Sequence, residues 1–515
     1  MTRRVGVPSS TTWLLILAVA AILLYARPAP GAEILVNTTS DGIVDDDGRC
    51  TLREAVAAAN ADAPLHGCSA GSGPDVIVLF FSQDHVLDEA GANEDQNLTG
   101  DFDIRSDITI RPEAPTGRVR IDAAGLDRVF DVFDGADLAL DRVVLVGGNV
   151  LGSGGAVLVR DAASQTQLVR SEVVGNASSV LGGGIYSEGI LRVIDSRVSD
   201  NASGFGGGIY MGAAPPLVLW RSFIADNRAT VGGGGLNLRA ATIQFSTIDG
   251  NEAGNSGGGL TVRSNGQAGD TTTLTNSTVG NNESTRSGGG IHFASPGVLE
   301  LSSVTIGWNA ADSDQDGLGD GGGLAVEAGS VRVRNTILTG NADLSTGGDP
   351  VAPDCVGTIT SWGYNLVSAL GSSCVLAGGV GDLTGTVASP LDAGVDSCLQ
   401  DNGGSSPTFA LTETSPALDS ADPAGCLGPG DSVLLVDQRG FERLVDGPDG
   451  DLVARCDRGA VEAGGEPFEE IFEDGFESGD LAAWGADDAR PRPVTTVDAA
   501  GGFFGGGGGG CGKLM

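Results

Sequence analysis

Aromatic residues, basic residues and histidine are all scarce in this chain of 515 residues. Phe, Trp and Tyr together make up 5%, and there are only three histidines, His66, His85 and His292. Lys and Arg number 29 against 67 acidic residues, which gives a formal net charge of −38. Nucleic acid and anionic membranes repel so acidic a surface, so we expect no nucleic-acid partner. The shortage of aromatics argues against an ordinary large-core globule, whereas 40% apolar residues are too many for a disordered chain.

Long apolar runs are missing after the N-terminal segment. Arg3 and Arg4 precede an apolar stretch at residues 13–25, which small residues follow at 29–32. This order is typical of a signal peptide, and we place it at residues 1–32. The stretch is shorter than the ~20 residues of a transmembrane helix, although an uncleaved anchor remains the alternative. We therefore predict an exported protein with no transmembrane segment in the mature chain.

The middle of the chain contains no cysteine, although the whole chain has eight. In an exported protein such cysteines form disulfides, and these would staple the two ends of the folded region. Proximity in the sequence predicts the pairs Cys50–Cys68, Cys355–Cys374 and Cys426–Cys456. The partner of Cys398 and the role of Cys511 stay open.

Glycine is abundant instead, with 84 residues, and it recurs in register with asparagine. Short segments that end in Asn are each followed by a glycine cluster, at a period of about 25 residues that lengthens toward the C-terminus. Weaker copies lie at the two ends of the series. The asparagines are Asn149, Asn176, Asn201, Asn227, Asn251, Asn282, Asn309 and Asn341.

The segments between these markers are short and alternate apolar with polar residues, as at 190–194 and 217–220. Such alternation indicates half-buried strands, and one coil of strands cannot bury its own apolar face without a neighbour. The sequence therefore predicts an all-β fold, a right-handed parallel β-helix of the pectin-lyase-like type, over residues 71–350. Glycine would make the turns, and asparagine would form a structural hydrogen-bonded ladder from coil to coil. Asn-x-Ser/Thr triplets in the repeat are then by-products of the ladder and not glycosylation sites.

One helix is expected, at residues 50–60, with Leu52, Ala55, Val56 and Ala59 on its apolar face. A β-helix exposes unpaired strand edges at its end, and we predict that residues 33–70 form an N-terminal cap over them. Residues 351–462 form a separate disulfide-containing region. Residues 463–515 read as a flexible tail with a glycine-rich end at 505–510.

Several segments resemble families of exported bacterial proteins. Residues 50–55, Cys-Thr-Leu-Arg-Glu-Ala, resemble the CSLREA domain, which in that family precedes β-helix regions. Residues 100–110, 121–122 and 127–132 are similar to the first coils of such proteins. The Gly-Gly-Gly-Ile-Tyr pieces at 182 and 206 are similar to repeats of polymorphic outer-membrane proteins. Residues 351–462 resemble a choice-of-anchor Q domain through motifs at 363–366, 381–385, 401–404, 415–419, 437–440 and 456–462. These resemblances imply cell-surface placement and no established reaction, and Cys398 departs from the last of them.

Catalysis is the weaker of two hypotheses. A polysaccharide lyase or glycoside hydrolase on this fold needs paired carboxylates or a calcium with a basic residue, and the repeats are poor in basic residues. The three histidines are isolated, and Trp220 and Trp308 fit packing better than sugar stacking. We therefore name no catalytic residue. The favoured function is an extracellular or cell-surface role in the Gram-negative outer envelope: adhesion, structure, or binding of a glycan or envelope component.

An acidic loop at residues 312–320 predicts a structural calcium site. Calcium prefers oxygen ligands at alternate positions around a tight turn. Asp312, Asp314 and Asp316 take positions one, three and five, Leu318 offers its carbonyl oxygen, and Asp320 takes position nine. Position twelve is Gly323, where a bidentate Glu would be usual, so affinity would be weak. A solvated acidic loop is the alternative here. For the acidic turn at Asp45, Asp46 and Asp47 a solvated loop is the favoured interpretation, and metal binding is the alternative.

Overall fold

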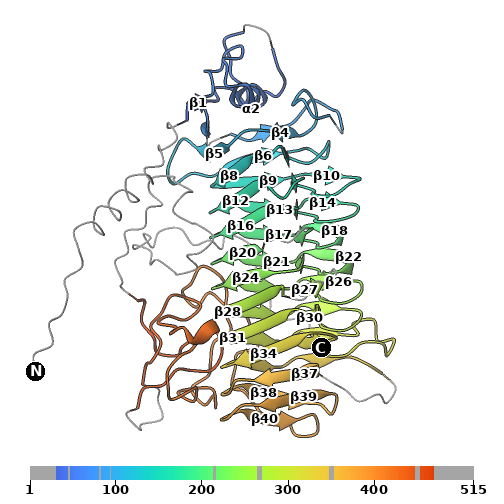
Figure 1. The fold of residues 1–515 in the computed structure, drawn as a ribbon, viewed down its shortest axis with the longest axis vertical. Coiled ribbons are helices and arrows are strands. Elements are labelled where there is room, and N and C mark those ends of the chain that lie inside the picture. The colour runs from blue at the N-terminus through green and yellow to red at the C-terminus, as the bar shows by residue number, and fades with distance from the viewer. Residues whose placement is uncertain are drawn as a thin grey trace, which may run out of the picture.

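The chain winds into a right-handed parallel β-helix of about nine turns, as Figure 1 shows, which confirms the predicted all-β solenoid. The computed structural model describes residues 31–468, except 45–46, 81–82, 93, 213–215, 264–268, 347–352 and 447–452. Most of the predicted signal peptide, Asp45 and Asp46, and most of the predicted tail with its glycine-rich end and Cys511 lie outside the described residues. Within the described residues, no helix is long and apolar enough to cross a membrane.

Each complete coil contributes strands to four faces, which we number in chain order. Face 1 consists of β1 (Glu33–Leu35), β2 (Asp75–Leu79), β5 (Ile108–Pro112), β8 (Asp137–Asp141), β12 (Gln165–Val169), β16 (Ile190–Ile194), β20 (Leu217–Trp220), β24 (Ala241–Gln244), β28 (Thr271–Gly280), β31 (Val298–Gly307), β34 (Ser330–Arg334), β37 (Cys355–Ser361) and β39 (Cys374–Gly378). Face 2 consists of β3 (His85–Val86), β6 (Val119–Asp122), β9 (Val143–Val146), β13 (Glu172–Val174), β17 (Arg197–Ser199), β21 (Phe223–Ala225), β25 (Thr247–Asp249), the second halves of β28 and β31, β35 (Ile337–Thr339), β38 (Leu366–Leu370) and β40 (Leu383–Thr386).

The other two faces have shorter strands. Face 3 consists of β10 (Asn149–Val150), β14 (Ala177–Ser178), β18 (Ala202–Phe205), β22 (Arg228–Gly232), β26 (Glu252–Ala253), β29 (Glu283–Ser284), β32 (Ala310–Ala311) and β36 (Ala342–Asp343). Face 4 consists of β4 (Phe102–Ile104), β7 (Phe130–Val132), β11 (Val157–Val159), β15 (Ile185–Ser187), β19 (Ile209–Met211), β23 (Leu236–Leu238), β27 (Leu260–Arg263), β30 (Ile291–Ala294) and β33 (Leu324–Val326), which pairs with β37.

Strand register stacks identical environments on top of one another. Leu168 on β12 pairs with Val193, and Val193 pairs with Leu219. All three side chains are fully buried. Alternate residues on the same strands, such as Gln167 and Arg192, form the outer row. The alternation seen in the sequence thus becomes one continuous apolar core with a polar outer surface.

Asparagines 176, 201, 227, 251, 282, 309 and 341 form an unbroken hydrogen-bonded ladder. Asn227 shows the pattern: its backbone N–H and its Nδ2 both donate to Oδ1 of Asn251 at 3.0 Å, and Nδ2 also donates to the Val198 carbonyl oxygen at 2.9 Å. Asn227 and Asn251 are both fully buried. Each asparagine side chain therefore forms hydrogen bonds with backbone groups in the turn that are not paired with a neighbouring strand.

The prediction for Asn149 is wrong. Asn149 is exposed and pairs with Ala177, one position past the ladder. Gly148 occupies the ladder position of that coil, and its N–H donates to Oδ1 of Asn176 at 2.9 Å. The ladder thus begins at Asn176. At the other end Asp354 closes it, because its Oδ1 accepts from Nδ2 of Asn341 at 2.9 Å.

Asp354 makes the last coil sensitive to pH. Its side chain is fully buried, and burial raises its pKa to about 7 although hydrogen bonds from Asn341 and Ala369 oppose the shift. In the unfolded chain an Asp titrates near 4. The folded-state pKa is the higher one, so the contribution of Asp354 to stability is complete below about pH 4 and is lost as pH rises through about 7.

We therefore expect the free energy of unfolding to fall between about pH 4 and pH 7, and to fall less steeply in Asp354→Asn. Urea unfolding at a series of pH values measures both slopes. Equal slopes in parent and variant would show that Asp354 does not titrate in this range.

Serine forms a second ladder at the bend between faces 1 and 2, a role we did not predict from its recurrence. The backbone N–H of Ser171 donates to Oγ of Ser196 at 3.0 Å, and Ser196 bonds to Ser222 in the same way at 3.1 Å. The series continues through Ser246 to Ser277.

The three glycines of each cluster have different tasks, which residues 233–235 illustrate. Gly233 has φ +66°, in the left-handed region that glycine favours. A Cβ on Gly234 would overlap the carbonyl oxygen of Gly258 in the next coil, and one on Gly235 would lie 2.9 Å from Cγ of ladder residue Asn251. The first glycine therefore makes the turn, the second lets two backbones approach closely, and the third makes room for the ladder.

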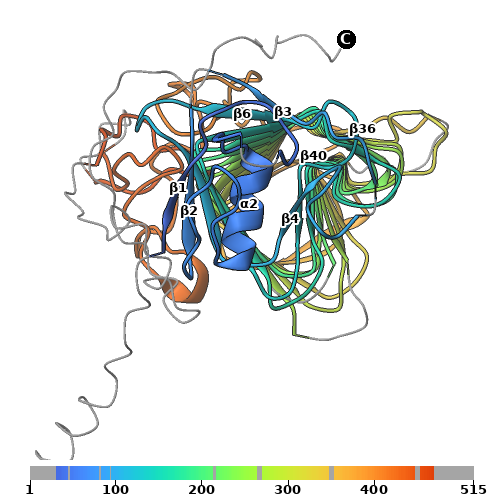
Figure 2. The same ribbon diagram turned by 90° about the horizontal axis from the view of Figure 1, so that it is seen from above.

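Helix α2 (Leu52–Ala61) covers the N-terminal end of the solenoid, as Figure 2 shows. Thr51 and Glu54 form a capping box at its start, and Cys50–Cys68 ties the cap down. Arg53 is fully buried; it pairs with Asp41 at 2.8 Å and donates to the Gly100 carbonyl oxygen at 2.7 Å. The Leu-Arg-Glu-Ala segment at residues 52–55 thus forms the inner surface of a cap.

We predicted that the parallel strands end at residue 350. They continue instead through β40 to Thr386. Residues 391–446 and 453–468 then turn back along face 2, on the side of the solenoid away from β4 (Figures 1 and 2). Trp308 packs on Phe409 with ring centroids 4.5 Å apart, and Gln438 bonds to Thr278 and Thr247. This returning segment, which includes the 3-10 helix η1 (Pro429–Asp431), is called the C-terminal region below.

Three disulfides are present as predicted: Cys50–Cys68, Cys355–Cys374 and Cys426–Cys456. Cys398 is also disulfide-bonded and belongs to none of these pairs. The second disulfide links β37 to β39 in the last coils, and the third holds the C-terminal region.

Candidate functional site

The outer surface of face 4 is the strongest candidate for a functional site. The first and third residues of each strand point into the core; Phe130 and Val132, for example, are fully buried. The middle residues therefore form one outward column. From the N-terminal end it consists of Asp103, Asp131, Leu158, Tyr186, Tyr210, Asn237, Thr261, His292 and Ala325.

The middle of this column combines aromatic rings with a guanidinium group. Tyr186 and Tyr210 stack with centroids 5.6 Å apart and an interplanar angle of 14°. The Arg263 guanidinium lies 4.3 Å from the centroid of the Tyr210 ring and donates to Oδ1 of Asn237. Because the rings face each other from coil to coil, their edges and hydroxyls, not their faces, are available to a ligand.

Hydrogen-bonding groups flank the stacked rings. The Tyr186 hydroxyl donates to Glu188, and both burial and this carboxylate raise the pKa of the tyrosine. A Cβ on Gly212 would contact the ends of these two side chains, so Gly212 lies directly beside the pair. On the next coils Arg239 pairs with Asp270 at 3.4 Å, and His292 Nε2 lies 2.9 Å from Glu327. Tyr186, Glu188 and Asp270 are partly exposed and Glu327 is exposed, whereas Arg239 and His292 are buried.

The N-terminal end of the column is a buried cluster of carboxylates. Asp103 and Asp131 are register partners on β4 and β7, and both are fully buried. Arg128 donates to Asp101 at 2.6 Å and to Asp131 at 3.0 Å. Arg160 also binds Asp131, through Nε at 2.8 Å.

Burial raises the pKa values of these acids. The pKa of Asp101 rises to about 8 and that of Asp103 to about 7, while that of Asp131 is raised despite its two arginine partners. Carboxyl groups whose pKa lies near 7 act as general acids in some hydrolases. Here, however, Asp101, Asp103 and Asp131 are at most 1% exposed, so a polymer does not reach them in this conformation.

The predicted calcium loop is only partly assembled. Asp312, Asp314 and Asp316 each place one carboxylate oxygen within 4.8 Å of the others. Asp312 accepts from the backbone N–H groups of Asp316 and Gly317, and such hydrogen bonds outweigh burial and lower its pKa.

The two remaining predicted ligands lie apart from this group. The Leu318 carbonyl oxygen accepts from Arg286 at 3.2 Å, and the same guanidinium lies 3.6 Å from Asp316. The backbone N–H of Asp320 donates to Ser287, and its carboxylate is not among the convergent oxygens. An arginine therefore occupies part of the position that the sequence assigned to a cation.

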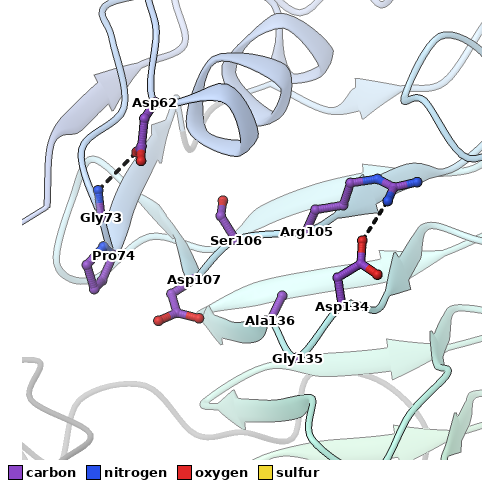
Figure 3. Close-up of a pocket in the computed structure, with 9 residues that line it drawn as sticks. All are labelled: Asp62, Gly73, Pro74, Arg105, Ser106, Asp107, Asp134, Gly135 and Ala136. Atoms are coloured by element: carbon purple, nitrogen blue, oxygen red, sulfur yellow. Dashed lines mark hydrogen bonds and ion pairs between the residues drawn. The ribbon is translucent and has the colours of Figure 1, made fainter.

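A hollow of about 320 Å³ lies between the cap and the first coils, as Figure 3 shows. Its polar walls are already paired: Asp62 accepts from the Gly73 N–H at 3.0 Å, and Arg105 bonds to Asp134 at 2.6 Å. It is open and lined by exposed carboxylates, so it offers no closed binding site.

Comparison with protein-family models, curated proteins and solved structures finds no match in any of the three. The CSLREA and choice-of-anchor Q resemblances therefore stay predictions. Trp220 packs edge-on against Phe245 at 4.7 Å, in line with the packing role expected for it.

Proposed function

We propose that this is an exported, non-catalytic β-helix protein of the cell surface or outer envelope that binds an extended glycan along face 4. The observation that carries this proposal is the row of polar side chains on face 4 from Tyr186 to His292, in which Tyr186, Tyr210 and the neighbouring Arg263 are partly exposed. Parallel coils repeat every ~4.8 Å, so the row offers hydrogen-bonding groups at a spacing comparable to one sugar unit of an extended chain. The net charge of −38 favours an uncharged glycan over an acidic one.

Export and surface placement rest on two further points. The N-terminal residues have the pattern of a signal peptide. Disulfides persist in oxidising compartments, and the solenoid contains them at both ends. The resemblance to the CSLREA and choice-of-anchor Q families agrees with this placement.

Arg263→Ala is expected to weaken binding of a neutral polysaccharide at least about tenfold. Losing a hydrogen bond to a charged donor costs ~1.5–3 kcal/mol, and 1.4 kcal/mol is a factor of ten. The measurement is a glycan array followed by calorimetry on the best ligand. Arg228→Ala is the matched control, because Arg228 is an exposed arginine on face 3 that pairs with Glu252 at 2.6 Å.

Equal losses in both variants would point to a nonspecific charge effect and would count against face 4. New reducing ends or unsaturated products from any polysaccharide would instead support the lyase or hydrolase alternative.

We also propose that the loop with Asp312, Asp314 and Asp316 binds calcium weakly, at ~10⁻⁴–10⁻³ M, as extracellular modules do. Arg286 alone does not balance the charge of the three carboxylates, so a bound calcium would stabilise the loop. Its role would therefore be structural. The melting temperature is expected to rise in millimolar calcium, and to rise less in Asp314→Ala plus Asp316→Ala. Glu252→Ala plus Glu283→Ala, which removes two adjacent carboxylates from face 3, is the control. Identical calcium responses in the loop variant and the parent would exclude this loop.

A further inference from the structure

Three carboxylates from separate segments converge beside the first coils. Asp95 comes from the turn at residues 89–100, Asp103 from β4, and Asp131 from β7. One oxygen of each lies within 4.8 Å of the others. Oxygens bound to one calcium at 2.3–2.6 Å are at most about 5 Å apart, so this spacing fits a shared cation.

Asp103 has an oxygen with no partner. Its Oδ2 accepts from the Asn97 N–H, but its Oδ1 is buried and has no hydrogen bond. The whole residue is fully buried. A buried carboxylate oxygen without a donor is costly, so this atom calls for a ligand.

The charges around the three converging carboxylates do not balance. Carboxylates outnumber guanidinium groups in the electrostatic surroundings of this group: Asp101 and Asp127 add to Asp95, Asp103 and Asp131, against Arg128 and Arg160. Glu94 adds to the negative side. The other nearby cations are already committed, since Arg53 pairs with Asp41 and Arg105 with Asp134. A divalent cation or protons must supply the missing positive charge.

We propose that Asp95, Asp103 and Asp131 bind one hard divalent cation, with Ca²⁺ as the best fit to an all-oxygen site. Arg160 already bonds to Asp95 at 2.7 Å and to Asp131, so the cation is needed chiefly at Oδ1 of Asp103. The side chain of Asp95 is 49% exposed, which leaves an entry path from solvent. A bound cation would fasten the turn at 89–100 to the first coil, independently of any glycan on face 4.

The experiment is hydrogen–deuterium exchange of the full chain, read by mass spectrometry, in chelator and in about 1 mM calcium. It is done in the Asp314→Ala plus Asp316→Ala background, so that the acidic loop does not contribute. Peptides covering residues 89–106 should exchange more slowly with calcium. Asp103→Asn keeps an acceptor for Asn97 and should shift the calcium midpoint at least about tenfold upward, since a carboxylate ligand is lost.

Asp134→Asn is the matched control, because Asp134 is a nearby exposed carboxylate that binds Arg105, as Figure 3 shows. It removes the same charge and should leave the midpoint unchanged. If Asp103→Asn folds poorly, Asp95→Ala tests the same site from its exposed side. No calcium-dependent protection at 89–106, or an equal shift in Asp134→Asn, would overturn the proposal.

Discussion

Replacing Gly234 by alanine is expected to destabilise the protein by at least about 4 kcal/mol, the range of the most damaging single substitutions. A Cβ at this position would overlap the carbonyl oxygen of Gly258 and lie 2.5 Å from that of Glu252, so two backbone segments of the next coil would have to move. Backbone atoms cannot rotate away as a side-chain end can. The displacement would also disturb Asn251, whose ladder bonds hold the same turn.

The measurement is soluble yield together with urea unfolding followed by circular dichroism. Gly152→Ala is the control, because a Cβ there would meet only the end of Arg128, at 4.0 Å. That variant should stay within about 0.5 kcal/mol of the parent. A Gly234→Ala protein as stable as Gly152→Ala would mean that the coils are not as close as described.

Arg443→Met is expected to cost about 3–5 kcal/mol and to release the C-terminal region from the solenoid. The Arg443 side chain is fully buried beside Glu462 at 3.3 Å, and it donates to Asn276 Oδ1 at 2.8 Å and to the Gly459 carbonyl oxygen at 2.9 Å. Removing it leaves the Glu462 carboxylate buried without its cation, which is the costly way to break such a pair. Burial raises the pKa of Glu462 and Arg443 opposes this shift, so loss of the arginine removes the main group that stabilises the ionised carboxylate.

Limited proteolysis and hydrogen exchange should therefore show residues 391–468 opening while the coils stay protected. Arg334→Met is the matched control: Arg334 also joins the solenoid to the C-terminal region, through Asp431 at 2.8 Å. Asp431 is 74% exposed, so this pair should contribute at most about 1 kcal/mol. Similar losses in the two variants would refute the buried-charge explanation.

The repeating part of the fold could be predicted because its cause is local. Each coil needs a left-handed turn, a close backbone approach and a ladder amide, and glycine and asparagine meet these needs one coil after another. Asn149 was misassigned because the chain there has Gly-Gly-Asn, and only the register with Ala177 shows which residue takes the ladder position.

The carboxylate cluster was not predicted because it exists only through register. Asp103 and Asp131 are far apart in the sequence, in coils where the Asn and Gly markers are absent, and nothing short-range links them. The packing of the C-terminal region along face 2 could not be predicted from the sequence for a similar reason. Gly280 and Gly307 lie in strands directly beneath the Phe409 ring. A glycine in a strand can indicate a close contact, but the sequence does not identify the segment that makes it.

The asparagine ladder also determines how this molecule can change in length. Successive ladder residues are separated by 25, 26, 24, 31, 27 and 32 residues, yet every step has the same hydrogen bonds. The turns absorb the difference, so a turn can gain or lose residues without shifting the coils above and below it. A whole coil can likewise be duplicated or deleted between two ladder asparagines with the cap and the C-terminal region unchanged. Any such change in length alters the solenoid, and with it face 4, in steps of one whole coil.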